Sequence, residues 1–391
     1  MNKNMERADI VIVGGGIAGV SLAYFLTTQG ITGVIVLEAE RLFNVHSSGR
    51  SNSNFIHLFE PDFLASLSVK SESFFRDPPE ALGSLPLISD HGAFTVVTEK
   101  DLPRHRAEIR KARELGIVVE EVEESKVLKR IPVLKPGRIA AAAYYPRSGP
   151  IDSASLSSLY VRHSRKAGVR FQLGRSLIGV RTMNGRIVEA LTDTGPIACD
   201  MVVNAAGAWA GHIGALCGAS AIPFSAKRRH LISASLPRAY EPHGWPSLRN
   251  NSVPFYMKAE SRHVLFSPMD EEDQAPGDCT TDDMQVALAA DRINQETTLE
   301  IRHIERKWAG FRTFAPDRIP VIGFDKKLHG FFWLAGQGGV GIQTSPALGL
   351  FAAQTIAGVA QADSISAAVS PVRFEVHGGR QFLKPKKGGE P

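Results

Sequence analysis

A glycine pattern near the start of the chain suits the binding of a pyrophosphate. Gly14-Gly15-Gly16-Ile17-Ala18-Gly19 reads G-x-G-x-x-G and lies between two apolar, strand-like runs. In such a pattern the first glycine permits a tight turn, the second lets the backbone approach a pyrophosphate, and the third allows a helix to pack closely on a strand. Glu38 follows the second run, where an acidic side chain would accept hydrogen bonds from ribose hydroxyls. An ordinary glycine-rich turn is the alternative, and Glu38 favours dinucleotide binding over it.

Two further segments are rich in small residues that could lie against a cofactor. Ser47-Ser48-Gly49-Arg50-Ser51-Asn52 suits a close approach of the backbone to a flat ring system, and a solvated loop is an equally good interpretation. Val203-Asn204-Ala205-Ala206-Gly207-Ala208-Trp209 reads as a strand that ends in small residues. These would let the chain pass close to a nucleotide, or simply pack a strand against its turn.

The last third of the chain contains two segments that suit an anion and an electron-accepting ring. Arg312 stands between Phe311 and Phe314 in an apolar run, which argues against an ordinary surface arginine. A buried guanidinium is the expected partner of a carboxylate. Residues 336–341 form a glycine-rich turn before a predicted helix over 345–358. A helix N-terminus there would stabilise negative charge on a reduced ring.

The elements that must position these segments begin with a βαβ unit, predicted as strand 9–13, helix 20–29 and strand 34–37. Asp152 is typical of a helix N-cap. Further strands are predicted at 93–97, 168–174, 187–191 and 200–204, a helix at 102–115, and a polar insertion at 270–283.

Composition excludes several classes of protein. The chain has 391 residues, of which 43% are hydrophobic and 22% charged, as in an ordinary globular protein. Its net charge of +5 is spread along the sequence and predicts no nucleic-acid partner. Cys199, Cys217 and Cys279 stand far apart, so we expect neither a disulfide framework nor a metal site. The sequence shows no transmembrane segment and no signal peptide, which predicts a cytoplasmic protein.

Taken together, these segments resemble the D-amino-acid oxidase and glycine/sarcosine oxidase family of FAD-dependent oxidoreductases, and most closely its bacterial D-arginine dehydrogenase type. The matching stretches span nearly the whole chain: 47–51, 204–209, 227–229, 255–256, 296–299, 308–314 and 330–344. The resemblance implies an α/β fold, with a doubly wound, Rossmann-like FAD-binding domain and a second, α+β substrate domain built on a mixed sheet. The expected boundaries are 1–78, 146–222 and 308–391 for the FAD-binding domain, and 79–145 and 223–307 for the substrate domain.

The resemblance also implies roles for individual residues. Arg312 and Arg229 match positions that hold the substrate carboxylate, and Tyr256 matches a phenol that hydrogen-bonds it. Lys227 and Arg228 adjoin Arg229, so only alternation along a strand would single it out. With the motifs above, the resemblance assigns non-covalent FAD to Gly14, Gly16, Ile17, Ala18, Gly19, Glu38, Ala39, Ser48, Gly49, Arg50, Ser51, Ala206, Gly207, Trp209, Gly336, Gly338, Gly339, Gly341, Ile342, Gln343 and Thr344.

The expected substrate pocket departs from the D-arginine type at its far end. Ala93 stands where that type carries a glutamate for the substrate guanidinium, Phe59 replaces a tyrosine, and Arg249 replaces a small apolar residue. His57, Gly339 and Gln343 complete the predicted pocket. Because a negative charge is lost and a positive one gained, we expect a neutral or acidic substrate side chain rather than a cationic one.

The resemblance implies oxidation of a D-amino acid, or more broadly of an amino-acid amine. Hydride transfer from Cα to flavin N5 would give an imino acid, which hydrolyses to a 2-oxo acid and ammonia; no residue is nominated as general base. The alternatives are a glycine/sarcosine-type secondary amine oxidase, a 2-hydroxy-acid dehydrogenase, or a flavoprotein subunit without turnover. The electron acceptor stays open among oxygen, a quinone and an electron-transfer protein.

Overall fold

The computed structural model describes residues 5–57, 63–83, 85–359 and 364–374. A six-stranded sheet grows out of the first βαβ unit. The apolar, β-branched runs form β2 (Ile10–Val13) and β3 (Val34–Glu38), which are almost completely buried, as expected of parallel strands covered on both faces. The sheet order is β20 (Val321–Phe324), β21 (Phe331–Ala335), β13 (Met201–Asn204), β2, β3 and β9 (Arg170–Leu173), with β20 alone antiparallel to its neighbour.

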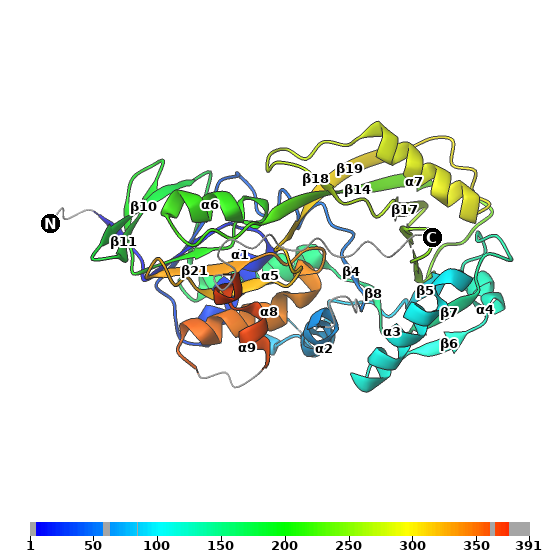
Figure 1. Cartoon of the computed structure of the whole chain (residues 1–391), viewed down its shortest axis with the longest axis horizontal. Coiled ribbons are helices and arrows are strands. Elements are labelled where there is room, and N and C mark those ends of the chain that lie inside the picture. The colour runs from blue at the N-terminus through cyan, green and yellow to red at the C-terminus, as the bar shows by residue number, and fades with distance from the viewer. Residues whose placement is uncertain (1–4, 58–62, 84, 360–363, 375–391) are drawn as a thin grey trace.

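Helices and a small sheet cover the two faces of this sheet (Figure 1). One face packs against α1 (Ile17–Thr28), α2 (Phe63–Arg76), α5 (Ser153–Lys166) and α8 (Gly341–Ile356). The other packs against α6 (Ala210–Cys217) and a four-stranded sheet of β1 (Glu6–Arg7), β12 (Ile197–Ala198), β11 (Arg186–Thr192) and β10 (Leu177–Met183). This layering confirms the doubly wound architecture that the family resemblance implies.

The second large sheet has nine strands of mixed direction. Its order is β18 (Glu272–Asp273), β14 (Ser225–Ser235), β17 (His263–Ser267), β16 (Phe255–Glu260), β15 (Ser247–Asn250), β5 (Ala93–Val97), β7 (Ala141–Tyr145) and β6 (Glu120–Val122), with β19 (Arg306–Phe314) paired to β14. β15 and β5 run parallel, whereas the other pairs are antiparallel. The predicted mixed sheet is thus confirmed.

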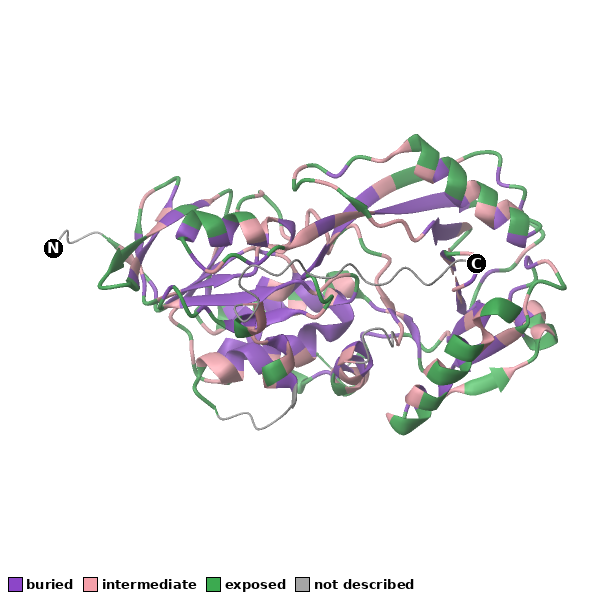
Figure 2. Ribbon diagram, in the orientation of Figure 1, coloured by how far each residue is buried: buried purple, intermediate pink, exposed green. Residues whose placement is uncertain are grey.

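Helices α4 (Glu124–Arg130) and α7 (Asp283–Glu296) help to bury one face of the nine-stranded sheet, and α3 (Leu102–Glu114) lies beside β7. Figure 2 shows these helices as green on their outer sides and the sheets as largely purple. The opposite face of the sheet turns toward the six-stranded sheet.

Each large sheet is assembled from separate stretches of chain. Residues 10–38, 170–204 and 321–335 supply the strands of the first, and residues 93–145 and 225–314 those of the second. The chain therefore returns to each sheet more than once. β19 belongs to the second sheet, and the boundary predicted at residue 308 lies inside this strand. The individual domain boundaries stay a prediction.

Within the described ranges, no helix is long and apolar enough to cross a membrane, and no cluster of histidine, cysteine or acidic residues could hold a metal ion. Cys199, Cys217 and Cys279 are all buried free thiols. The cytoplasmic location stays a prediction.

Candidate active site

The turn between β2 and α1 has the geometry that its glycines predict. Gly14 adopts φ +114°, and a Cβ there would lie 2.4 Å from the Ala205 carbonyl oxygen. A Cβ on Gly19 would lie 1.9 Å from the Gly14 oxygen, so this glycine lets α1 pack on its own turn. Glu38 accepts hydrogen bonds from the N–H groups of Gly15 (2.7 Å) and Glu40 (2.9 Å). The carboxylate is therefore fixed beside the turn.

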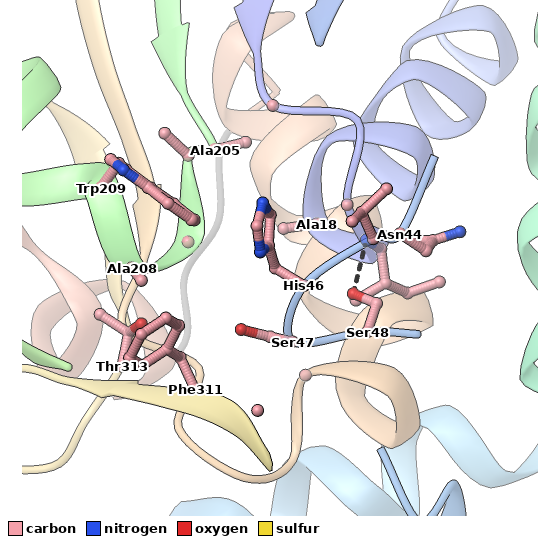
Figure 3. Close-up of a pocket in the computed structure, with 18 of the residues that line it drawn as sticks. Ala18, Asn44, His46, Ser47, Ser48, Ala205, Ala208, Trp209, Phe311 and Thr313 are labelled. Carbon is pink, nitrogen blue, oxygen red and sulfur yellow. Dashed lines mark hydrogen bonds between the residues drawn. The ribbon is translucent and has the colours of Figure 1, made fainter. Parts of the chain in front are cut away.

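A long cavity begins at this turn and ends at the nine-stranded sheet. Glu38 and Arg175 line one end, and Arg312 and Thr313 the other. Figure 3 shows His46 and Ser48 on one side of the cavity and Trp209, Ala205 and Ala208 on the other, with Phe311 and Thr313 rising from β19. The cavity brings together all five segments that the sequence singles out.

Most of the predicted cofactor residues line this cavity: Gly14, Gly16, Ile17, Ala18, Glu38, Ala39, Ser48, Arg50, Ser51, Ala206, Gly207, Trp209, Gly338, Gly339, Gly341 and Ile342. Gly19, Gly49, Gly336, Gln343 and Thr344 do not line this cavity, although Gln343 lines the adjoining cavity described below. Gly49, for example, packs against the backbone of Asn44, where a Cβ would lie 2.0 Å from its oxygen. Thr344 is fully buried and donates to the Val340 carbonyl within α8. These residues shape the cavity without facing it.

The loop 44–52 is held in place by hydrogen bonds to α1 and to the part of the chain that contains the second sheet. Ser48 Oγ accepts the N–H of Ile17 at 3.1 Å, at the N-terminus of α1. The Arg50 guanidinium donates to the carbonyls of Cys279 (3.0 Å) and Ala309 (3.2 Å) and pairs with Asp278 (2.8 Å). Its charge is thus used to tie the loop to the second sheet, a role that the sequence does not reveal.

Sequence reasoning missed several residues that line the cavity. The His46 ring packs at a tilt against Trp209, with 4.6 Å between ring centroids, and its Nε2 lies 3.0 Å from Glu40 Oε1. Arg175 lies at the Glu38 end, although no motif surrounds it. The only available signal for His46 was its place next to the serine-rich segment.

A second cavity lies on the pocket-facing side of the nine-stranded sheet and adjoins the first. Arg229, Arg312 and Tyr256 line both cavities, so the three residues predicted to hold a carboxylate lie where the two meet. Strand alternation explains this. Arg229 pairs with Gly310 and Lys227 with Arg312 in the β14–β19 ladder, so Arg229 and Arg312 share a face.

Arg229 is 5% exposed and is held rigidly. Its Nε donates to the Asp270 carbonyl at 2.6 Å, and one Nη donates to Glu271 Oε1 at 3.0 Å. Burial, together with the charge of Arg312, lowers the pKa of Arg229 to about 10, so the guanidinium remains a cation at neutral pH. Two cations that face one cavity attract an anion.

Glu271 balances part of this charge. Both of its carboxylate oxygens accept N–H groups of Arg318 at 3.0 Å, and Arg318 in turn lies over the Phe314 ring at 3.9 Å. Burial raises the pKa of Glu271, but Arg318, Arg229 and Arg312 together outweigh burial and lower it. The carboxylate is therefore ionised and links the second sheet to the loop that follows β19.

The far end of the second cavity contains the residues that depart from the D-arginine type. Ala93 pairs with Ser247 across β5 and β15, and Arg249 pairs with Tyr256 across β15 and β16, so Ala93, Arg249 and Tyr256 share the pocket-facing side. The cavity lining also includes Arg104 and Glu108, whose side chains pair at 3.5 Å. Glu108 is an acidic group that sequence reasoning missed.

Three other predicted pocket residues have different outcomes. Burial is the main cause that lowers the pKa of His57 to about 4, so this lining imidazole is neutral at pH 7. The Gln343 amide accepts the N–H of Ile56 (3.1 Å) and donates to its carbonyl (2.8 Å), so Gln343 positions the segment before α2. Gly339 lies against Arg312, 2.7 Å from the guanidinium if a Cβ is added. Phe59 lies outside the described residues.

Comparison with known proteins identifies the family. A family model described as FAD dependent oxidoreductase matches residues 9–355. The chain belongs to this family.

The FAD-dependent oxidoreductase is similar to several characterised proteins. It is 23% identical to the mitochondrial dimethylglycine dehydrogenase of Rattus norvegicus over 86% of this chain, and it spans about two fifths (41%) of that relative's length. It is 26% identical to FAD-dependent oxidoreductase domain-containing protein 1 of Bos taurus, covering 90% of this chain and 81% of the relative.

Solved structures share the fold. The L-proline dehydrogenase of P. horikoshii superposes with a TM-score of 0.86 at 21% identity, covering 95% of this chain and 99% of that one. The glycine oxidase of Bacillus cereus gives 0.80 at 18% identity, covering 97% and 100%. These likenesses confirm the predicted fold class.

The cavity residues fit FAD. Gly16 lines the cavity, where an added Cβ would meet nothing closer than Ser48 Oγ at 3.6 Å, and as the N-cap residue of α1 it has no side chain to cover the helix N-terminus. This end suits a pyrophosphate. Glu38 suits ribose hydroxyls at one end, and the Gly338–Ile342 turn faces the other end, beside Arg312. The cofactor prediction is thereby confirmed as FAD.

Proposed function

We propose that this FAD-dependent oxidoreductase oxidises the amine of an amino acid, with D-amino acids as the first candidates. The observation that carries the proposal is the meeting of Arg229, Arg312 and Tyr256 at the junction of the two cavities. Two guanidinium groups and a phenol there suit a substrate carboxylate. A carboxylate held at that junction places the neighbouring Cα at the FAD-binding cavity.

The chain's own residues bind and orient the substrate. When bound, FAD would supply the acceptor for the hydride that leaves Cα as the nitrogen lone pair forms the C=N bond. Arg312 and Arg229 fix the carboxylate, which limits how Cα can lie. His57 is neutral, and we assign no general base, since an amine that has already lost its proton needs none. Water then converts the imino acid to a 2-oxo acid and ammonia.

A secondary amine is the second candidate substrate. The relatives include proteins named dimethylglycine dehydrogenase and sarcosine dehydrogenase, whose names denote N-methylated amino acids. Such compounds keep the α-carboxylate that the two arginines suit, so the same site serves both candidates. A 2-hydroxy acid shares the carboxylate as well and belongs in the same test.

Anaerobic reduction of the bound flavin tests these candidates directly. D- and L-amino acids, N-methyl amino acids and 2-hydroxy acids are mixed with the oxidised enzyme, and loss of the flavin absorption is followed. We expect bleaching by amino acids that retain a free α-carboxylate and none by the corresponding amides. A flavin that no amine reduces would contradict the proposal and favour a subunit without turnover.

A further inference from the structure

On the side of β14 that faces β17 and β18, the ladder is interrupted next to Arg229. Ile232 pairs with Phe266 on β17, whereas Arg228 pairs with Glu272 on β18. Residues 229–231 therefore face the longer stretch 267–271, which bulges from the sheet, and Met269 within it adopts φ +57°. Bulges of this kind re-aim groups beside functional sites. Here the bulge delivers two oxygen atoms to the Arg229 guanidinium.

A buried pair of side chains holds this bulge to β14. Asp270 Oδ2 lies 2.7 Å from His230 Nδ1, and Asp270 Oδ1 accepts the His230 backbone N–H at 2.9 Å. The two side chains are 3% and 0% exposed. Since His230 follows Arg229 on the strand, its ring lies on the opposite face of the sheet, beneath the start of α7. Asp270 thus contacts His230 through its side chain and Arg229 through its carbonyl.

The third contact of the ring fixes where its proton lies. The backbone N–H of Asp282 donates to His230 Nε2 at 2.8 Å, so Nε2 must carry the lone pair. Nδ1 then carries the proton and donates it to Asp270. Burial raises the pKa of Asp270, but the hydrogen bonds from His230 and the charge of Arg229 outweigh burial and lower it. A neutral imidazole therefore donates to an ionised carboxylate.

We propose that Asp270 and His230 are positioning residues that hold the plane of the Arg229 guanidinium for a substrate carboxylate. The inference rests on the proposed function, because it takes Arg229 as a carboxylate ligand. Arg229 Nε and one Nη are already bound to Asp270 and Glu271, which fixes the guanidinium plane. A carboxylate binds a guanidinium edge-on within that plane, so a rotated plane loses hydrogen bonds even though the charge is unchanged.

Asp270→Asn separates positioning from simple electrostatics by the sign of its effect. The new amide has one NH₂ group, which must face either the backbone N–H of His230 or its ring Nδ1–H. If the ring proton moves from Nδ1 to Nε2 to relieve the second clash, Nε2–H then faces the Asp282 N–H. Every arrangement therefore opposes two donors, and the bulge shifts. Electrostatics alone predicts the opposite result, because removing a negative charge beside Arg229 should tighten the binding of an anion.

The test measures the binding of acetate to the FAD-loaded enzyme, followed by the flavin absorption spectrum at constant ionic strength. We expect Asp270→Asn to weaken acetate binding about tenfold. The half-saturating concentration of the best substrate in anaerobic flavin reduction should rise similarly, with a smaller change in the limiting rate. Asp273→Asn is the matched control: Asp273 pairs with Lys227 (2.8 Å) on the same ladder and is 73% exposed, so acetate binding should stay as in the wild type.

A double-mutant cycle distinguishes positioning from general loosening. In an Arg229→Leu background, Asp270→Asn should have no further effect on acetate binding. An equal, additive loss in that background would overturn the inference, as would unchanged or tighter binding in the single Asp270→Asn variant. Should that variant fail to fold, His230→Phe removes the same contact and takes its place in the cycle. Acetate binding that is unaffected by Arg229→Leu itself would contradict the proposed carboxylate site instead.

Discussion

At the scale of single residues, the site is defined by how far nearby acidic groups compensate the positive charge of each arginine. Arg229 is bound by Asp270 and Glu271, and Arg318 by Glu271, so their charges are largely compensated within the protein. Arg312 lies against Gly339 and faces both cavities. This division assigns the stronger attraction for a carboxylate to Arg312, and a more geometric role to Arg229.

The first prediction follows for Arg312. Replacement by leucine should lower kcat/KM for flavin reduction, by an amount equivalent to about 2–5 kcal/mol of lost transition-state stabilisation. The reason is that a charge-assisted carboxylate pair both binds and orients the substrate. FAD should stay bound, since the residue lies at the far end of the cofactor cavity from Glu38. Stopped-flow reduction measures the rate. The control is Arg302→Leu, because the Arg302 side chain pairs with Glu300 at the surface and is 86% exposed. Wild-type turnover in Arg312→Leu would remove this residue from the site.

The second prediction concerns the substrate side chain. Arg249, Arg104 and Glu108 line the far end of the pocket, where cations outnumber the acidic group. A cationic side chain there meets like charge and loses the carboxylate that Ala93 replaces, which costs several kcal/mol, whereas an acidic side chain gains a partner. We expect D-glutamate and D-leucine to reduce the flavin better than D-arginine.

Anaerobic competition among these three amino acids checks this expectation. Arg249→Ala should selectively slow reduction by D-glutamate and leave reduction by D-leucine nearly unchanged, because only the former carries a second carboxylate. If D-arginine is the best substrate, the interpretation of the far end of the pocket is wrong, whatever the fold.

At the scale of elements, the sequence predicts regular structure well where glycine and apolar patterns act locally. The structure has the expected strands at 10–13 and 34–38. It also has the expected helix N-cap at Asp152, whose side chain accepts the Ser155 N–H at 2.9 Å. Both glycine-flanked helices begin earlier than predicted: α1 at Ile17 and α8 at Gly341. The glycine turns are shorter than the sequence predicts, because each leads directly into helical backbone.

Long-range contacts explain what the sequence did not predict. The insertion at 270–283 reads as a polar loop, yet it supplies Asp270, Glu271 and the Asp278 carboxylate that binds Arg50. Nothing local marks these residues, since their partners lie 40 or more positions away. Similarly, Lys227, Arg228 and Arg229 look alike in sequence. Alternation along β14 separates only Arg228 from the other two, and the fold then shows that Arg229, not Lys227, lines the two cavities.

The third prediction tests the packing of α1 on its turn. Gly19→Ala would place a Cβ 1.9 Å from the Gly14 oxygen, a backbone atom that cannot move aside without shifting the helix. We expect a loss of about 1–3 kcal/mol of stability and weaker FAD binding, because the α1 N-terminus moves from the pyrophosphate site. Thermal unfolding and FAD titration measure the two effects.

A glycine in an open position provides the control for this substitution. Gly211 in α6 has Phe224 as its nearest neighbour, 4.0 Å from an added Cβ. Gly211→Ala should therefore be neutral or stabilising by about 0.5–1 kcal/mol, as in an exposed helix. Equal destabilisation by both substitutions would contradict the packing argument.

At the scale of the whole molecule, the two cavities join where the two large sheets approach each other, and Arg50 ties the loop 44–52 to β19 and to the segment around Cys279. We therefore expect FAD to lie between these two parts of the fold. The three cysteines lie outside the residues that line the cofactor cavity within the described chain.

The fourth prediction is accordingly that FAD is held non-covalently. Precipitation with acid should leave all of the yellow chromophore in the supernatant. A chromophore that stays with the precipitated chain would contradict the prediction, and would direct attention to His46 and His212, the imidazoles that line the cavity.

The fifth prediction links a half-buried histidine to the stability of the holoenzyme. His57 packs against Phe55 and Tyr145, and burial, the main cause, lowers its pKa from 6.5 to about 4; the Glu72 carboxylate opposes the shift and Arg76 adds to it. Between pH 6.5 and 4 the unfolded chain therefore binds a proton that the folded chain does not. Stability must rise with pH across this window, and the loss on acidification from this group approaches about 3 kcal/mol at pH 4.

Replacing His57 by phenylalanine keeps the aromatic packing and removes the titrating group. We expect the free energy of unfolding, measured by chemical denaturation, to fall less steeply between pH 7 and 5 in His57→Phe than in the wild type. The comparison at pH 8, where the imidazole is neutral in both states, gives the packing cost of the substitution alone, and the shared carboxylates cancel in the difference. Parallel profiles for the two proteins from pH 8 to 5 would show that the imidazole of the folded chain titrates normally and is open to solvent.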